Sequence, residues 1–146
     1  MYKRFIFLTL SILWMVLIYS MSAKTASAST EDSMFITDYI IKFFFSNPSD
    51  EFLSFAENII RKIAHFTEYA VLSILLTLTL KSFGLTLKKS ALAVLISFLY
   101  AISDEIHQYF VPGRAGRAFD VLIDTSGAFV GYIILVYFQK IFVRNK

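Results

Sequence analysis

Ionisable and amide side chains in the second half of the chain have the residue types needed for acid–base chemistry or for anion binding. The candidate catalytic residues are the acids and bases His65, Glu68, Asp104 and Glu105. The candidate binding residues are Lys62, Gln108, Arg114, Arg117, Asp120 and Asp124. Carboxylates and imidazoles transfer protons, and Arg holds carboxylate or phosphate through two parallel hydrogen bonds. These residues therefore predict a binding or catalytic site for a charged ligand.

The spacing of these residues places several of them on shared helical faces. Lys62, His65 and Glu68 follow one another at intervals of three residues, which puts all three on one side of a helix. Asp104 and Gln108 are four residues apart and share a face for the same reason. Each of these sets can therefore act together.

Two acids and two glycines form a further stripe near the end of the chain. Asp120, Asp124, Gly127 and Gly131 are separated by steps of four, three and four residues. A Gly-x-x-x-Gly pair lets a second helix approach closely in a membrane. We therefore expect both aspartates to face the interior of a helical bundle rather than lipid.

The elements that must position these groups are apolar helices. Hydrophobic residues make up 57% of the 146-residue chain and charged residues only 17%, less charge than a soluble domain of this size carries. Four segments, residues 5–21, 63–80, 91–110 and 121–143, are apolar, and each is near the ~20 residues that a bilayer core requires. The sequence predicts an all-α fold, a polytopic membrane bundle of about four transmembrane helices.

The first apolar segment has two interpretations. Lys3 and Arg4, the apolar stretch and a later Ala26-Ser27-Ala28 resemble a cleavable signal peptide. The apolar stretch is long for such a peptide, and Ala26 lies well beyond its end. We therefore favour a retained transmembrane helix.

The distribution of charge predicts the orientation in the membrane. With the N-terminus in the cytoplasm, eight of the 14 Lys and Arg residues lie inside and all 11 acidic residues lie outside. The cationic excess is the feature that the positive-inside rule uses. We expect a multi-pass protein of the plasma membrane with both termini in the cytoplasm and the polar groups at the outer face.

Residues 22–61 form an outer segment that is too long for a bare connection. We expect residues 22–33 to be mobile, and residues 34–45 and a stretch beginning at Ser49 to form one or two interfacial helices, the second leading into the second span. A loop packed on the bundle is the alternative. The chain thus divides into an N-terminal helix (1–21), this outer segment (22–61) and a three-helix membrane core (62–146).

Two ligands suit polar groups gathered at one depth. A lipid headgroup or lipid-linked phosphate would be held by Lys62, Arg114 and Arg117, with His65 or Glu68 as acid or base. A divalent metal is the weaker alternative, because the chain has no HExxH-type motif. The sequence indicates no particular cofactor, and its scattered basic residues argue against nucleic acid as a partner. Charged residues near the ends of spans can also be simple interfacial anchors.

Three polar motifs and the glycine pair follow one another along the chain. They are Lys62-x-x-His65-Phe66-x-Glu68-Tyr69, Asp104-Glu105-x-x-Gln108-x-Phe110-x-Pro112-Gly113-Arg114, Asp120-Val121 and Gly127-x-x-x-Gly131. This pattern resembles the VanZ-like family of membrane proteins. The resemblance implies a cell-envelope setting, since the founding member is associated with low-level teicoplanin resistance in Gram-positive bacteria, and it implies no particular reaction. Asp124 departs from the family pattern, which usually has Asn there, so the role of that residue is not carried over.

Two hypotheses follow. In the first, the polar site binds or modifies an envelope lipid or a lipid-linked wall intermediate. In the second, the protein is a non-catalytic scaffold, a homo-oligomer or a partner of another envelope protein, and the polar cluster only locks the helices together. A transporter is disfavoured, because the inner halves of the spans are poor in charged residues.

Overall fold

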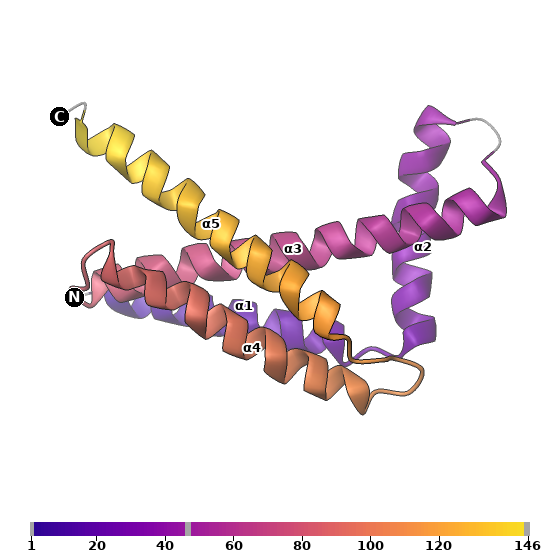
Figure 1. The fold of residues 1–146 in the computed structure, drawn as a ribbon, viewed down its shortest axis with the longest axis horizontal. Coiled ribbons are helices and arrows are strands. Elements are labelled where there is room, and N and C mark those ends of the chain that lie inside the picture. The colour runs from indigo at the N-terminus through magenta and orange to yellow at the C-terminus, as the bar shows by residue number, and fades with distance from the viewer. Residues whose placement is uncertain (1, 46–47, 145–146) are drawn as a thin grey trace.

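Five α-helices make up the chain in the computed structural model, which describes residues 2–45 and 48–144 (Figure 1). They are α1 (Tyr2–Ser22), α2 (Ala26–Phe44), α3 (Asp50–Ser82), α4 (Leu92–Tyr109) and α5 (Ala118–Arg144), with a short 3₁₀ turn (Lys89–Ala91) before α4. No strand occurs within the described ranges. The predicted all-α fold is confirmed.

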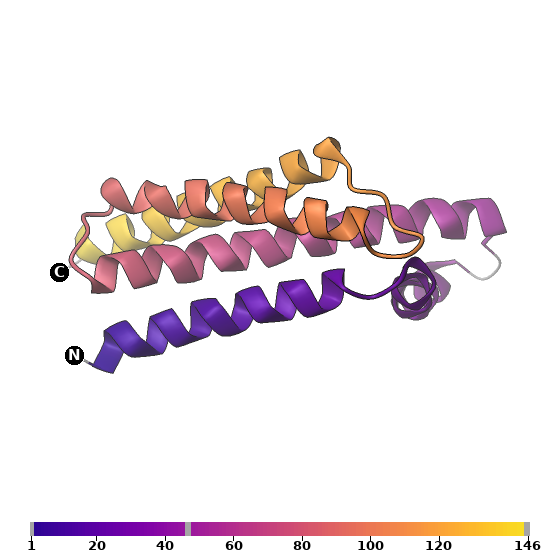
Figure 2. The same cartoon turned by 90° about the horizontal axis from the view of Figure 1, so that it is seen from below.

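Four of these helices, α1, α3, α4 and α5, are long and apolar enough to cross a membrane. They run along a common direction, with the N-terminus, the C-terminus and the α3–α4 connection at one end (Figures 1 and 2). The opposite end, which we call the polar end, holds the α1–α2 connection, α2, the start of α3 and the α4–α5 loop. The prediction of four spanning helices is thereby confirmed. Lys146, which contributes to the predicted inside charge, lies outside the described residues.

The first turn of α3 explains where this helix begins. Ser49 is the N-cap, and its side chain accepts a hydrogen bond from the backbone N–H of Phe52 at 3.3 Å. Asp50 and Glu51 in the first turn favour the helix through its dipole. No break follows for 33 residues, a length of about 50 Å at the rise of an α-helix. The second outer helix and the second span are therefore one continuous helix.

The outer segment also contains one separate helix, α2. The expectation that residues 22–33 are mobile is wrong, because Thr25 caps α2 and accepts a hydrogen bond from the N–H of Ala28. α2 lies across the direction of the other helices (Figures 1 and 2). Its Ser33 hydroxyl donates to the buried carboxylate of Glu57 on α3 at 2.8 Å. An interfacial location suits its exposed aromatic residues, which include Phe35.

α5 packs closely against α3. A Cβ atom added at Gly127 would overlap the carbonyl oxygen of Phe66, and one added at Gly131 would overlap that of Ala70. The glycine stripe therefore has the predicted role of admitting a neighbouring backbone. Fully buried side chains of α3, such as Tyr69, extend this contact into the core of the bundle.

Replacing Gly127 with Leu is expected to force α3 and α5 apart. Overpacked cores lose about 1–3 kcal/mol, and we expect the upper part of this range because the obstacle is backbone. The measurement is the free energy of unfolding in detergent. Phe129→Leu, at an exposed position of the same helix, is the matched control and should unfold as wild type does. Equal stability of the two variants would contradict the close contact.

Candidate functional site

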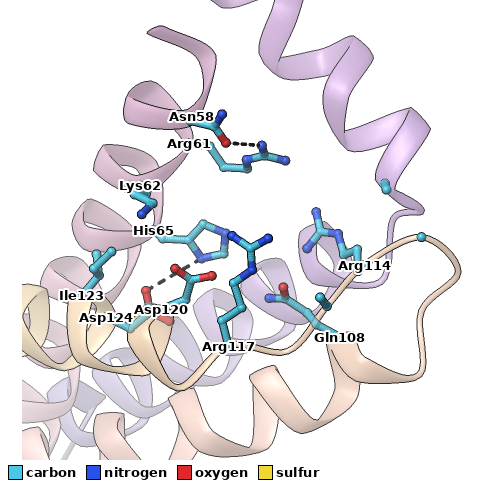
Figure 3. A pocket seen from close by; sticks show the side chains of 13 residues that line it. Asn58, Arg61, Lys62, His65, Gln108, Arg114, Arg117, Asp120, Ile123 and Asp124 are labelled. Carbon is cyan, nitrogen blue, oxygen red and sulfur yellow. Dashed lines mark hydrogen bonds and ion pairs between the residues drawn. The ribbon is translucent and has the colours of Figure 1, made fainter. Parts of the chain in front are cut away.

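A pocket of about 280 Å³ opens at the polar end of the bundle, where α3, the α4–α5 loop and the start of α5 meet (Figure 3). Its polar lining consists of Asn58, Arg61, Lys62, His65, Gln108, Arg114, Arg117, Asp120 and Asp124. Seven of these nine residues belong to the ten candidates of the sequence analysis. The fold thus brings together candidate side chains from α3, α4, the α4–α5 loop and α5.

The wall formed by α3 is a single helical face. Asn58, Arg61, Lys62 and His65 recur at intervals of three and four residues. Arg61 donates to the amide oxygen of Asn58 at 3.0 Å, and the ammonium of Lys62 lies 4.8 Å from the ring centre of Phe119. Asn58 and Arg61 are absent from the sequence candidates, although the same spacing extended by one turn would have included them.

The opposite wall is the loop between α4 and α5. Pro112 and Gly113 occupy the centre of a tight turn that the N–H of Arg114 closes on the carbonyl of Val111 at 3.1 Å. Gly113 has a φ of +77°, a conformation that a turn of this kind needs and that glycine adopts without strain. This turn directs the Arg114 side chain toward the pocket (Figure 3).

Arg114 also joins this loop to α2. Its guanidinium donates to the hydroxyl of Ser29 at 2.6 Å, and the N–H of Ala26 donates to the carbonyl of Pro112 at 3.3 Å. Burial lowers the pKa of Arg114, and the nearby Arg61 lowers it further. A guanidinium pKa starts so far above neutrality that Arg114 stays charged. Ser29 had no signal in the sequence, because it lies far from Arg114 along the chain.

The floor of the pocket is a pair formed by His65 and Asp124 (Figure 3). The Nδ1 atom of His65 lies 3.8 Å from a carboxylate oxygen of Asp124, whose side chain is 0% exposed, whereas that of His65 is 21% exposed. Within the described part of the chain, neither oxygen of Asp124 has a hydrogen-bond partner. The imidazole therefore lies between a buried carboxylate and the pocket, and because 3.8 Å is too long for a hydrogen bond, the Nδ1 atom of His65 is also unpaired within the described residues.

Asp104 and Glu105 are near the pocket but are absent from its lining. Asp104 accepts hydrogen bonds from the Ser22 hydroxyl at 2.7 Å and from the Gln108 amide at 2.9 Å, which joins the end of α1 to α4. Glu105 accepts a hydrogen bond from the backbone N–H of Arg117 at 2.7 Å, just before α5 begins. Both buried carboxylates hold helix ends in place.

Glu68 lies beside a second, smaller cavity of about 120 Å³. This cavity shares Arg61, His65 and Arg114 with the pocket. The backbone carbonyl of Glu68 accepts a hydrogen bond from the indole N–H of Trp14 at 2.9 Å, which fixes this turn of α3 against α1. The predicted face of Lys62, His65 and Glu68 is thus divided between two adjoining cavities.

The lining of the pocket favours an anion. Four cations, Arg61, Lys62, Arg114 and Arg117, face two carboxylates there. Among the residues that the structure describes, no carboxylate lies within ion-pair distance of Lys62, Arg114 or Arg117. Nor do three or more His, Cys, Asp or Glu side chains of the described ranges gather in a way that could hold a metal. Phosphate or carboxylate suits this lining better than a cation does.

Glu105→Leu is expected to destabilise the protein, because the N–H of Arg117 loses its acceptor in a partly buried place. The loss should be about 1–3 kcal/mol in the free energy of unfolding, measured by denaturation in detergent. Glu105→Gln keeps an acceptor oxygen and should lose less. If Leu and Gln variants unfold alike, this hydrogen bond does not hold the start of α5.

Comparison with known proteins agrees with the motifs on which the resemblance was based. The family model described as VanZ/LLP1 matches residues 7–141, a range that adds α2 and most of α1 to the region of those motifs. No curated protein and no solved structure matches the chain. Because the match covers nearly all of the sequence, this four-span helical protein belongs to the VanZ/LLP1 family.

Proposed function

We propose that the pocket binds the phosphate group of a membrane lipid or of a lipid-linked cell-wall intermediate, at the outer face of the plasma membrane. The observation that carries the proposal is the convergence of four cationic side chains on one pocket at the end of a membrane bundle. Lipid phosphates are the anions that this depth of a bilayer offers in quantity.

The side chains supply the chemistry that phosphate binding needs. Arg114 and Arg117 offer planar forks of N–H donors from one short loop, and Lys62 adds a compact charge from α3. Arg117 extends toward His65 (Figure 3), and in the described residues its side chain has no hydrogen-bond partner. It is therefore free to bind a ligand without breaking a contact of the fold.

Loss of the Arg117 charge should weaken binding of a lipid phosphate. For Arg117→Gln we expect a Kd at least about tenfold higher for a polyprenyl monophosphate, since a hydrogen bond to a charged group contributes about 1.5–3 kcal/mol. Native mass spectrometry and titration of detergent-solubilised protein measure it. Lys88→Gln, an exposed position at the opposite end, is the control variant, and the polyprenol with the same tail but no phosphate is the control ligand.

Equal binding of the phosphate and the alcohol would contradict the proposal, and so would unchanged binding by Arg117→Gln.

Incubating the protein with the polyprenyl monophosphate also tests for chemistry at the His65–Asp124 pair. A lipid product of new mass that His65→Gln abolishes would extend the proposal from binding to modification. Under the proposal, a bacterium that depends on this protein for teicoplanin protection should lose that protection with Arg117→Gln, as a susceptibility assay would show.

The proposed orientation can be tested directly, because the chain has no cysteine. Ala115→Cys places a thiol in the α4–α5 loop, and Thr86→Cys places one in the α3–α4 connection, both at exposed positions. A membrane-impermeant maleimide added to intact cells should label Ala115→Cys alone, and Thr86→Cys only after permeabilisation. The reverse pattern would put the pocket in the cytoplasm.

A scaffold is the second candidate function, and specific contacts favour it. The hydrogen bonds of Asp104, Glu105 and Arg114 each join two elements of the bundle. The two candidates differ over Lys62 and Arg117, whose side chains make no such bonds within the described residues. A purely structural cluster requires that Lys62→Gln and Arg117→Gln change stability without changing lipid binding, whereas a phosphate site requires the opposite.

A further inference from the structure

A further hollow, distinct from the small cavity beside Glu68, lies between α4 and α5 and adjoins the polar pocket. It measures about 520 Å³, and Phe98, Ile102, Ile106, Tyr109, Val121 and Leu122 form most of its wall. We call it the α4–α5 groove. Its α4 wall is one helical face, since these four residues of α4 are separated by steps of four, four and three. The groove is therefore an open, apolar surface depression along the helices.

Both walls of the groove belong to membrane-spanning helices. Ile106 is 58% exposed and Leu122 is 60% exposed, as expected for side chains that face lipid in a bilayer. The face from Phe98 to Tyr109 covers 11 helical steps, about 16 Å at the rise of an α-helix. That is about half of a hydrocarbon core of ~30 Å, so the groove is about as long as one leaflet is thick.

Arg117 connects the groove to the polar pocket. It lines both cavities, and its backbone N–H is held by the buried carboxylate of Glu105, which also lines the groove. Gly116 lies so close to α4 that an added Cβ would be 2.5 Å from the carbonyl oxygen of Glu105. The loop therefore packs against α4, and Arg117 lies at the junction between the cationic pocket and the apolar groove.

We propose that the α4–α5 groove holds the hydrocarbon tail of the lipid whose phosphate occupies the polar pocket. This inference rests on the function proposed above. It names the ligand as an amphiphile with its anionic group beside Arg117 and its chain along α4, in a single leaflet. A water-soluble phosphate would occupy the pocket alone, and a lipid bound only by its tail would not contact the cationic side chains.

Filling the groove should weaken binding of the tail and leave binding of the phosphate intact. Leu122→Trp and Ala118→Leu enlarge side chains of the groove wall, and Phe129→Trp, exposed elsewhere on α5, is the control. The probes are a long-chain polyprenyl monophosphate and a short-chain isoprenyl monophosphate. We expect groove variants to raise the Kd of the long-chain probe about tenfold or more, with that of the short-chain probe within about twofold of wild type.

The outcomes separate this inference from the function on which it rests. If the groove variants bind the long-chain probe as wild type does while Arg117→Gln loses it, the tail lies elsewhere and the inference is overturned. If wild type binds neither probe, the proposed function fails as well. A long-chain probe with a photoreactive group in its tail gives a measurement without any variant. Crosslinks to α4 and α5 support the groove, and crosslinks confined to α1 or α2 overturn it.

Discussion

The floor of the pocket depends on the contact between the backbones of α3 and α5. Gly127 and Gly131 leave no room for a side chain against the carbonyls of Phe66 and Ala70. His65 directly precedes Phe66, and Asp124 lies one turn before Gly127. The same close approach that packs the two helices therefore sets the 3.8 Å separation of His65 and Asp124. A looser helix pair would keep all of these residues and lose the floor of the pocket.

A membrane bundle can keep so many buried polar groups at one end only if most of them have partners, because an unpaired polar group costs free energy away from water. The carboxylates of Asp104 and Glu105 meet this condition through helix-end hydrogen bonds. Lys62 and Arg117 meet it through access to the pocket. Asp104 and Glu105 therefore build the site, whereas Lys62 and Arg117 are available to a ligand. This difference follows from where the side chains lie and not from their residue types.

Much of the architecture could be predicted from the sequence, because apolar segment length and glycine spacing are local properties. The four spanning helices, the cap at Ser49, the Pro112–Gly113 turn and the inward stripe of α5 are examples. The start of α2 was missed, because a stretch rich in Ser, Ala and Thr is ambiguous until Thr25 caps it. The roles of Asp104 and Glu105 were beyond sequence reasoning, since their partners Ser22 and the N–H of Arg117 come from other elements. The pairing of Arg114 with Ser29 is likewise a product of tertiary structure.

The continuity of α3 has a mechanical consequence. Its 33 residues contain neither proline nor glycine, and sharp kinks in helices nearly always need one of these, a π-bulge or an inserted group. α3 is therefore one unbroken helix that contacts α2 at the polar end and forms one wall of the pocket farther along. Bending this wall is not a route by which a ligand can enter. The opposite wall is the α4–α5 loop, where Gly113 and Gly116 flank Arg114, so the pocket lies between one unbroken helix and one glycine-containing loop that hydrogen bonds join to α2 and α4.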